Sequence, residues 1–279
     1  MGVSELVKRS LDDVLAKQSR AVKHFADLDL LAQLFMMKAN VAVNLEHRDE
    51  SRDYVVSVEM DPVPVEIALT FGDGIQNFRS TLDYLARALV LANGMRPVDG
   101  GRGSTQFPIL LRRPDGGVTI RPGVSPEAAE IVERVQPYNA DEPEKHPLWR
   151  LHELSNTDKH RLLHITALSG SVAGVLVPID QAKPSPITPD RPRYTVALVP
   201  GHTQTIDAGE NYIGPARLGG EWSYTVVLGH SDSPWSEQLL LLGSEINRFL
   251  IDSVLQPLTK VARSDAVRNF GRADSRAGA

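Results

Sequence analysis

Residues 151–161, which read LHELSNTDKHR, gather side chains that can exchange protons or bind a metal ion. The chain has only eight histidines, and two of them, His152 and His160, lie in this stretch together with Glu153 and Asp158. An imidazole with an ordinary pKa of about 6.5 takes up and releases protons near neutral pH, and imidazoles and carboxylates are also metal ligands. The stretch therefore predicts a catalytic strip, a metal site or the polar flank of an ordinary helix.

The same stretch matches only part of the HExxH motif of zinc peptidases. His152 and Glu153 fit the motif, but Asn156 occupies the position of the second histidine, and asparagine is a poor zinc ligand. On a helix, the step of five residues from Glu153 to Asp158 turns the two side chains about 140° apart. Because one helix cannot direct all these groups at one ion, a metal site would need further ligands, such as His164 or Asp73. We therefore expect no metal ion and no other cofactor.

A second set of polar side chains lies in GDGIQNFRSTLDYLARAL, residues 72–89. Apolar residues that recur every three or four positions predict a helix from about Pro64 to Ala92 with one buried seam, formed by Ile75, Phe78, Leu82, Leu85 and Leu89. Nearly opposite this seam runs a stripe of polar and aromatic residues: Asp73, Asn77, Ser80, Tyr84 and Arg87. Such a stripe suits the binding of a polar ligand or of a second partner.

Arg79 and Asp83, four residues apart on this helix, have two interpretations. Their spacing is that of an ordinary surface ion pair. However, Arg79 lies only about 80° from the apolar seam, close enough to enter a crevice between helices. In such a crevice its guanidinium could hold a phosphate.

In the N-terminal part of the chain, the spacing of the apolar residues changes once. Residues 4–38 carry apolar side chains at helical spacing, which predicts one long helix or two helices broken near Asp27. The period then becomes two over residues 41–47 and 54–60, and the polar segment between these runs predicts a β-hairpin. Residues 95–124, rich in Gly, Pro and Arg, predict a long loop. This loop lacks the Gly-Lys-Ser/Thr sequence with which a phosphate-binding loop ends.

Two more helices and a β-rich segment complete the pattern. Ser125 is expected to cap a short helix, and Pro147 to open the helix that contains residues 151–161. Short β-runs separated by turn residues follow, at residues 162–168, 172–179, 194–199, 204–209 and 222–228. We interpret LSGSVAG, residues 168–174, as a hairpin turn. It does not match the G-x-S-x-G elbow of serine hydrolases, and no segment matches a dinucleotide-binding loop.

This order of elements predicts an α+β fold: a helical bundle with an inserted β-hairpin, followed by an antiparallel β-sheet and a closing C-terminal helix. We expect a single domain over residues 1–262, with a helical part at about 1–160, a β-rich part at about 161–232 and the closing helix at about 234–262. Residues 263–279, which are rich in Arg, Gly, Ala and Ser, are expected to form a flexible tail.

The composition is that of a soluble globular protein, with 42% hydrophobic and 23% charged residues and no apolar run of about 18 residues that could cross a membrane. The N-terminal segment lacks the apolar core of a signal peptide. Zero cysteines exclude disulfides and thiolate chemistry. These features predict a cytoplasmic protein. A net charge of −5 argues against broad, sequence-independent binding of nucleic acid, which usually requires a basic surface.

The segments GDGIQNFRSTLDYL, FPI, QPY and LHELSNTDKHRLL together resemble a group of uncharacterised bacterial proteins seen often in actinobacteria. The corresponding segments of that group read approximately GDxxxNxRSxLDHL and LxxLxxxDKHR, and the resemblance covers roughly residues 54–165. At one remove, the arginine of the first segment, followed five residues later by histidine in that group, resembles the R-x4-6-H signature of HEPN helical bundles. In this chain Arg79 matches the arginine, whereas Tyr84 stands in the place of the histidine.

The HEPN resemblance implies a metal-independent ribonuclease that acts as a dimer, or an inactive relative of one. Tyrosine, with an ordinary pKa of about 10, is a poor substitute for histidine in proton transfer at neutral pH. The implied chemistry would therefore pass to His152 or His160, with Arg79 on the phosphate and with Lys159 and Arg161 adding positive charge. The residues expected to take part in catalysis are Arg79, Tyr84, His152 and His160.

Two other hypotheses stay open. A small-molecule hydrolase would use a polar pocket between bundle and sheet. The residues expected to bind substrate are Asp73, Asn77, Asp83, Glu153, Asn156, Asp158, Lys159 and Arg161. A non-catalytic binding or scaffold protein would instead use the polar stripes as buried hydrogen-bond networks between helices. The expected partner is RNA or a small polar ligand, with a second copy of the chain in a homodimer.

Overall fold

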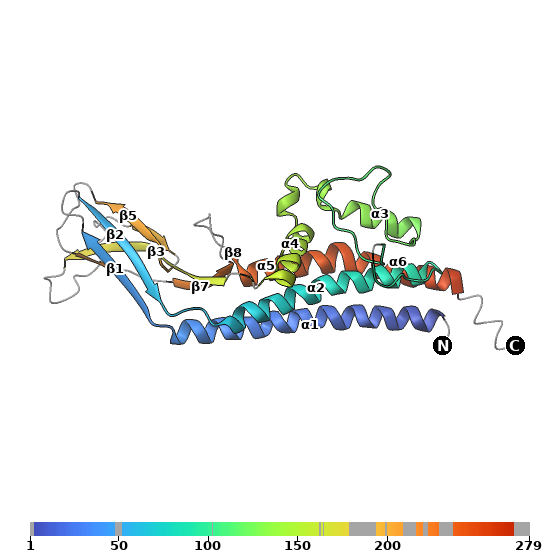
Figure 1. The fold of residues 1–279 in the computed structure, drawn as a ribbon, viewed down its shortest axis with the longest axis horizontal. Coiled ribbons are helices and arrows are strands. Elements are labelled where there is room, and N and C mark those ends of the chain that lie inside the picture. Colours follow the sequence, from blue (N-terminus) through green and yellow to red (C-terminus); the bar gives the residue numbers. More distant parts are fainter. Residues whose placement is uncertain are drawn as a thin grey trace. The chain divides into compact units, whose positions relative to one another are not determined.

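The computed structural model describes residues 3–47, 52–101, 103–161, 163, 165–178, 194–198, 200–208, 216–219, 223–228 and 237–270. It confirms the predicted α+β class, because helices form a bundle and strands form antiparallel sheets (Figure 1). The chain divides into two compact units built from separate segments. Unit 1 comprises Met1–Asp27, Leu69–Leu163 and Leu240–Ala279, and unit 2 comprises Leu28–Ala68 and His164–Leu239. The single domain expected from the sequence stays a prediction.

The helices of residues 3–160 lie close to where the sequence predicts them, and the first, α1, is one unbroken helix over Val3–Lys38. The others are α2 (Val65–Ala92), α3 (Pro126–Arg134), α4 (Pro147–His160), α5 (Leu239–Phe249) and α6 (Gln256–Phe270), with 3₁₀ turns at Pro137–Asn139 and Pro143–Lys145. Ser125 caps α3 as expected, because its hydroxyl accepts a hydrogen bond from Ala128 N–H at 3.4 Å. Among the described helices, none combines the length with the apolar composition that crossing a bilayer demands.

The strands form two antiparallel sheets in unit 2. The predicted hairpin is confirmed: β1 (Val41–His47) pairs with β2 (Asp53–Met60), and β5 (Thr203–Asp207) adds to β2 on its other edge. The second sheet has the order β4 (Tyr194–Leu198), β3 (Ile165–Pro178), β7 (Ser223–Leu228) and β8 (Glu237–Gln238), with β6 (Ala216–Gly219) paired to the end of β3. Alternate residues of β2 are buried in the core of this unit, with members of β4 and β5: Tyr54, Val56, Val58, Val196, Leu198 and Ile206.

Two expectations about the second half of the chain are wrong. The hairpin turn expected at residues 168–174 does not exist, because β3 continues through it and its pairing with β4 shifts register between Ser171 and Gly174. The small residues that suggested a turn therefore accompany an irregularity of the β-bulge kind.

The bounds of the closing helix also differ from those expected. It begins at Leu239 rather than near residue 234, and it continues to Phe270 rather than ending at residue 262. Ala262 and Ala266 are buried on one face of α6, so residues 263–270 are helical instead of belonging to a flexible tail. The rest of the predicted tail lies outside the described residues.

A π-helical turn, Leu250–Leu255, joins α5 to α6. Gln256 N–H donates to the carbonyl of Ile251, five residues back. Pro257 follows directly, and a proline inside a helix lacks an N–H and brings its ring against the carbonyl four residues earlier. The wider turn relieves this collision, so α5 and α6 follow each other without a loop.

The core of unit 1 depends on two apolar seams. Every residue of the predicted α2 seam is at most 1% exposed, which confirms it. On α1, buried residues recur in steps of three and four, beginning with Val7, Leu11 and Val14. Phe25 continues this seam: its ring stacks on that of Phe78, 5.3 Å between centroids, and meets the ring of Phe71 edge-on at 5.8 Å.

Phe25 also occupies space that two glycines leave free. A Cβ atom added at Gly74 of α2 would lie 2.8 Å from the Phe25 ring, and one added at Gly243 of α5 would overlap it. One aromatic ring therefore fills the place of two missing side chains and fixes the spacing of α1, α2 and α5.

Replacing Leu82 by Ala should lower the free energy of unfolding by about 2–5 kcal/mol, because a fully buried side chain is lost and a cavity remains. Leu69→Ala is the matched control, since Leu69 lies on the same helix but is 53% exposed. Its effect should stay within about 0.5 kcal/mol. Denaturant unfolding measures both, and equal losses would contradict the central role of the α2 seam.

Candidate functional site

A polar contact attaches α4 to α2, and Figure 1 shows the two helices steeply inclined to each other. The nitrogen of the Gln76 amide donates to the Ser155 carbonyl at 2.8 Å and to Asp158 Oδ2 at 3.0 Å. The amide oxygen accepts from the Ser155 hydroxyl at 3.1 Å. One turn earlier on α2, a Cβ atom added at Gly72 would overlap the Asp158 carboxylate. The helices therefore approach closely, and Asp158 is part of their contact.

Arg79 and Asp83 form an ion pair on α2, and both also bind the backbone of Phe107. Arg79 Nη2 donates to Asp83 Oδ1 at 2.8 Å and to the Phe107 carbonyl at 2.9 Å. Asp83 Oδ1 accepts from Phe107 N–H at 3.0 Å. The ion pair thus binds both backbone polar groups of Phe107, which lies in the 95–124 loop. The sequence did not predict this role.

This ion pair is largely withdrawn from water, since the Arg79 side chain is 11% exposed and that of Asp83 30%. Burial lowers the pKa of Arg79 below its ordinary value, against the opposing effect of Asp83. Burial also raises the pKa of Asp83, although Arg79, the Phe107 N–H and Lys159 all act in the other direction. For both groups, burial affects the pKa more than the partner's charge does. The i,i+4 ion pair that the sequence predicted is therefore formed, but it is partly buried against the backbone of Phe107 instead of lying freely at the surface.

His152 of α4 lies within electrostatic reach of the pair. Its ring lies 5.2 Å from that of Trp149 between centroids, and its Nε2 lies 2.9 Å from the Asn156 amide nitrogen. An amide NH₂ group can only donate, so Nε2 is the acceptor. Partial burial lowers the pKa of His152, and the positive charges of Arg79 and Lys159 lower it further. The imidazole is therefore neutral at neutral pH.

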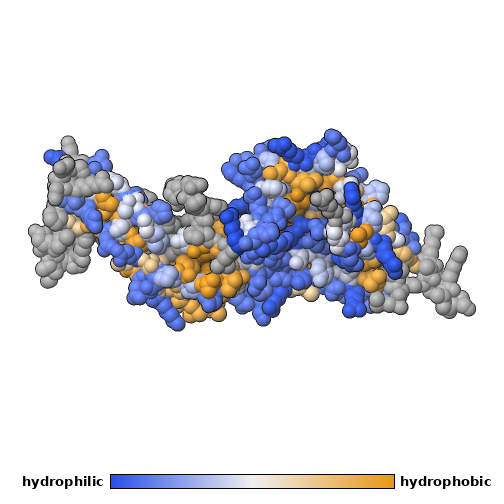
Figure 2. All heavy atoms as spheres, in the orientation of Figure 1, coloured by the Kyte–Doolittle hydropathy of each residue, from blue (hydrophilic) through white to orange (hydrophobic). Residues whose placement is uncertain are grey.

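We call Arg79, Asp83, His152, Lys159 and the Phe107 backbone the Arg79 cluster. The residues of this cluster that belong to helices lie on α2 and α4, and Figure 2 shows hydrophilic side chains gathered over α4 and the neighbouring part of α2. The cluster contains four of the charged or basic groups that the sequence singled out on two distant segments, together with the loop residue whose backbone binds Arg79 and Asp83.

Tyr84 has different neighbours. It is 37% exposed, and Lys17 Nζ of α1 lies 5.9 Å from the centroid of its ring. Lys17 also donates to Asn77 Oδ1 at 3.5 Å, and the Asn77 amide donates to the carbonyl of the exposed Asp73 at 2.8 Å. This part of the polar stripe thus contacts α1, whereas Arg79 and Asp83 bind the loop at Phe107. The two positions of the R-x4-6-H signature do not share one face of α2.

The remaining residues predicted on α4 lie at the surface: Glu153, Asn156, Lys159 and His160 are exposed. Arg161 is exposed as well and follows α4 as its C-cap. His164 lies outside the described residues. Within the part of the chain that the structure describes, no three His, Asp or Glu side chains are grouped so that they could hold a metal ion.

Sequence reasoning missed Gln76, Ser155 and Phe107. Gln76 precedes Arg79 and Asp83 by three and seven residues, a helical spacing that could have placed all three on one face. The sequence offered no comparable signal for Ser155. One of its two hydrogen bonds to Gln76 uses its backbone carbonyl, which every residue possesses. Phe107 acts in the cluster only through its backbone, which residue type does not reveal.

No protein-family model matches the chain, and neither a curated protein nor a solved structure matches it. The resemblance to the bacterial group and to HEPN bundles therefore stays a prediction, and the geometry alone guides the interpretation of the cluster.

Replacing Lys159 by Gln should raise the pKa of His152, because it removes one of the two positive charges that favour the neutral imidazole. NMR titration of the His152 ring protons measures the change, and Arg161→Gln serves as a neighbouring control that should leave the pKa unaltered.

In the wild-type protein, the pKa of His152 should lie below its ordinary value of about 6.5. Because the folded-state pKa is the lower one, the stability linked to His152 is complete above about pH 6.5 and is lost as the pH falls through the folded value. An unchanged pKa in Lys159→Gln would show that Lys159 does not act on His152.

Proposed function

We propose that the chain is a non-catalytic binding or scaffold protein, whose motif residues fix the fold of the bundle unit instead of performing chemistry. The supporting observation is that the four segments that carry the resemblance interlock through hydrogen bonds. They contribute, in chain order, Gln76, Arg79 and Asp83; the backbone of Phe107 and Pro108; Gln136; and Ser155 with Asp158.

Residues 107–110 are held much as a bound peptide would be. The ion pair of the Arg79 cluster binds both polar groups of Phe107. A second side chain, Gln136, is 1% exposed, accepts from Leu110 N–H at 3.1 Å and donates to the Pro108 carbonyl at 3.0 Å. Polar side chains that pair with consecutive backbone groups provide the kind of support that a buried loop requires. The motif residues thus have a structural purpose without any reaction.

Nη2 of Arg79 is already engaged in this support, since it serves both Asp83 and Phe107. A polar partner would therefore meet the exposed face of α4, which carries Asn156, Lys159 and His160. RNA and a small polar ligand are the partners whose chemistry fits amide, ammonium and imidazole groups.

Arg79→Ala should lower the free energy of unfolding by about 1–3 kcal/mol, because Asp83 and the Phe107 carbonyl lose their buried donor. Arg87→Ala is the matched control on the same helix. Arg87 pairs with Asp99, but these side chains are 39% and 80% exposed, so the loss should be at most about 1 kcal/mol. Thermal and denaturant unfolding compare the two, and equal stabilities would remove the main support for a scaffold.

One observation favours a second candidate, a metal-independent ribonuclease. Nη1 of Arg79 is buried and has no hydrogen-bond partner among the described residues. The neutral His152 is close enough for the charge of Arg79 to lower its pKa. In cleavage of a phosphodiester by the ribose 2′-hydroxyl, the bond from 2′-oxygen to phosphorus forms and the bond from phosphorus to 5′-oxygen breaks. The reaction needs a cation for the phosphate and a base that takes the 2′-hydroxyl proton and returns it to the departing 5′-oxygen. Arg79 and His152 would supply them.

A cleavage assay on mixed single-stranded and structured RNA, with a chelator present, separates the two candidates. The scaffold proposal predicts that purified wild-type protein cleaves nothing. The ribonuclease candidate predicts cleavage that His152→Ala abolishes and that His202→Ala, a change at an exposed residue of unit 2, leaves intact. Metal-independent cleavage lost only in His152→Ala would overturn the scaffold proposal.

A further inference from the structure

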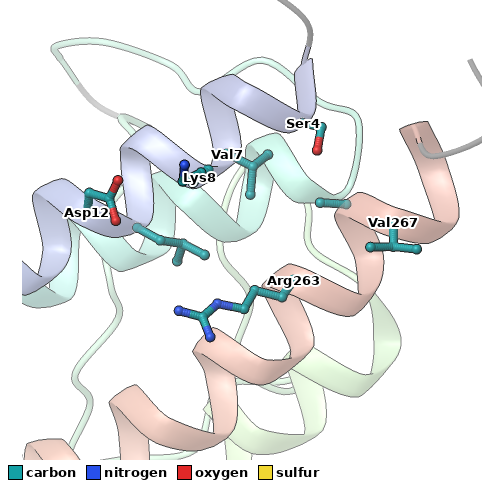
Figure 3. Close-up of a pocket in the computed structure, with 8 residues that line it drawn as sticks. Ser4, Val7, Lys8, Asp12, Arg263 and Val267 are labelled. Atoms are coloured by element: carbon teal, nitrogen blue, oxygen red, sulfur yellow. The ribbon is translucent and has the colours of Figure 1, made fainter. Parts of the chain in front are cut away.

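A groove lies within unit 1 between the first turns of α1 and the last turns of α6 (Figure 3). Its volume is about 340 Å³. Val7, Leu11 and Ala266 line it and are each at most 5% exposed, so they form an apolar base. The groove shares no residue with the Arg79 cluster and is independent of the function proposed above.

The hollow arises from the sizes of the facing side chains. Farther along α1, two glycines face Phe25, and the large ring fills the space that they leave. At the groove, α6 presents Ala266, and α1 presents the short side chains of Val7 and Leu11. Among the residues that the structure describes, none with an aromatic side chain lines the groove.

Charged side chains surround the apolar base from both helices. Lys8 and Asp12 belong to α1 and Arg263 to α6 (Figure 3). Lys8 and Arg263 are exposed, and neither has an ion-pair or hydrogen-bond partner among the described residues. Two cations and one carboxylate leave one positive charge in excess at the groove.

Volume and charge together define the ligand. A volume of about 340 Å³ is at the small end of the range for ligand sites, which is about 300–1,000 Å³. The apolar base suits a short hydrocarbon chain, and a guanidinium binds a carboxylate through two parallel hydrogen bonds. The carboxylate of Asp12 disfavours a doubly charged head group by like-charge repulsion.

We propose that this groove binds a small amphiphilic monocarboxylate, with its hydrocarbon chain against Val7, Leu11 and Ala266. Its carboxylate pairs with Arg263, and Lys8 adds a second positive charge. The ligand class is therefore that of short- and medium-chain carboxylic acids.

Isothermal titration calorimetry of the full chain with sodium octanoate tests the proposal, with n-octanol as the uncharged probe of equal chain length. Octanoate should bind saturably with one site per chain, and n-octanol at least about tenfold more weakly. Arg263→Gln should weaken octanoate binding by at least about tenfold and leave n-octanol binding unchanged.

Two further variants control for charge and for position. Arg9→Gln removes a neighbouring exposed charge of α1 that does not line the groove, and it should leave octanoate binding unchanged. Ala266→Phe should fill the groove and abolish binding of both probes, with circular dichroism confirming that the variant folds. Absence of saturable binding by the wild type, equal affinity for the two probes, or full octanoate affinity in Arg263→Gln would each overturn the proposal.

Discussion

Burying the Arg79 guanidinium removes water from a group that keeps its charge, so the surrounding protein has to supply the missing hydrogen bonds. Asp83 provides the opposite charge, and the carbonyl of Phe107 provides a second acceptor. Asp83 in turn takes a donor from Phe107 N–H. The attachment of Phe107, in the 95–124 loop, to α2 thus follows from the solvation of one side chain. Gln76 and Gln136 follow the same rule, because each amide bonds to backbone groups of the segment that it holds.

The helices and the hairpin could be predicted because their signals are local. Steps of three and four mark the seam of α2, and alternation marks β1 and β2. The end of α6 could not be predicted in this way, since Ala262 and Ala266 are small residues that other elements bury. Glycines and serines in residues 168–174 favour turns by their own propensity, but pairing with β7 and β4 overrides that preference. Both errors come from partners that are distant in sequence.

In the candidate site, too, the residues with a local sequence signal could be predicted, and those that depend on distant contacts could not. Arg79, Asp83 and His152 were found from residue type and from angles on a helix. Tyr84 was joined to Arg79 only by motif spacing, although a step of five residues separates side chains by about 140° on a helix. Phe107 contributes an N–H and a carbonyl that any residue possesses, so only a folded structure could identify it.

The hydrogen bonds to residues 107–110 join parts of one chain. The 95–124 loop that contains these residues is anchored at one end by α2 and at the other by α3. A segment tethered in this way rebinds at an effective concentration that decreases only gradually with loop length. Its separate hydrogen bonds can therefore be weak and still keep it in place. A cut at the exposed Gly116 would leave the segment attached by one end and multiply its accessible conformations. Docking would then be a binding equilibrium, for which a free peptide of the same backbone geometry could compete.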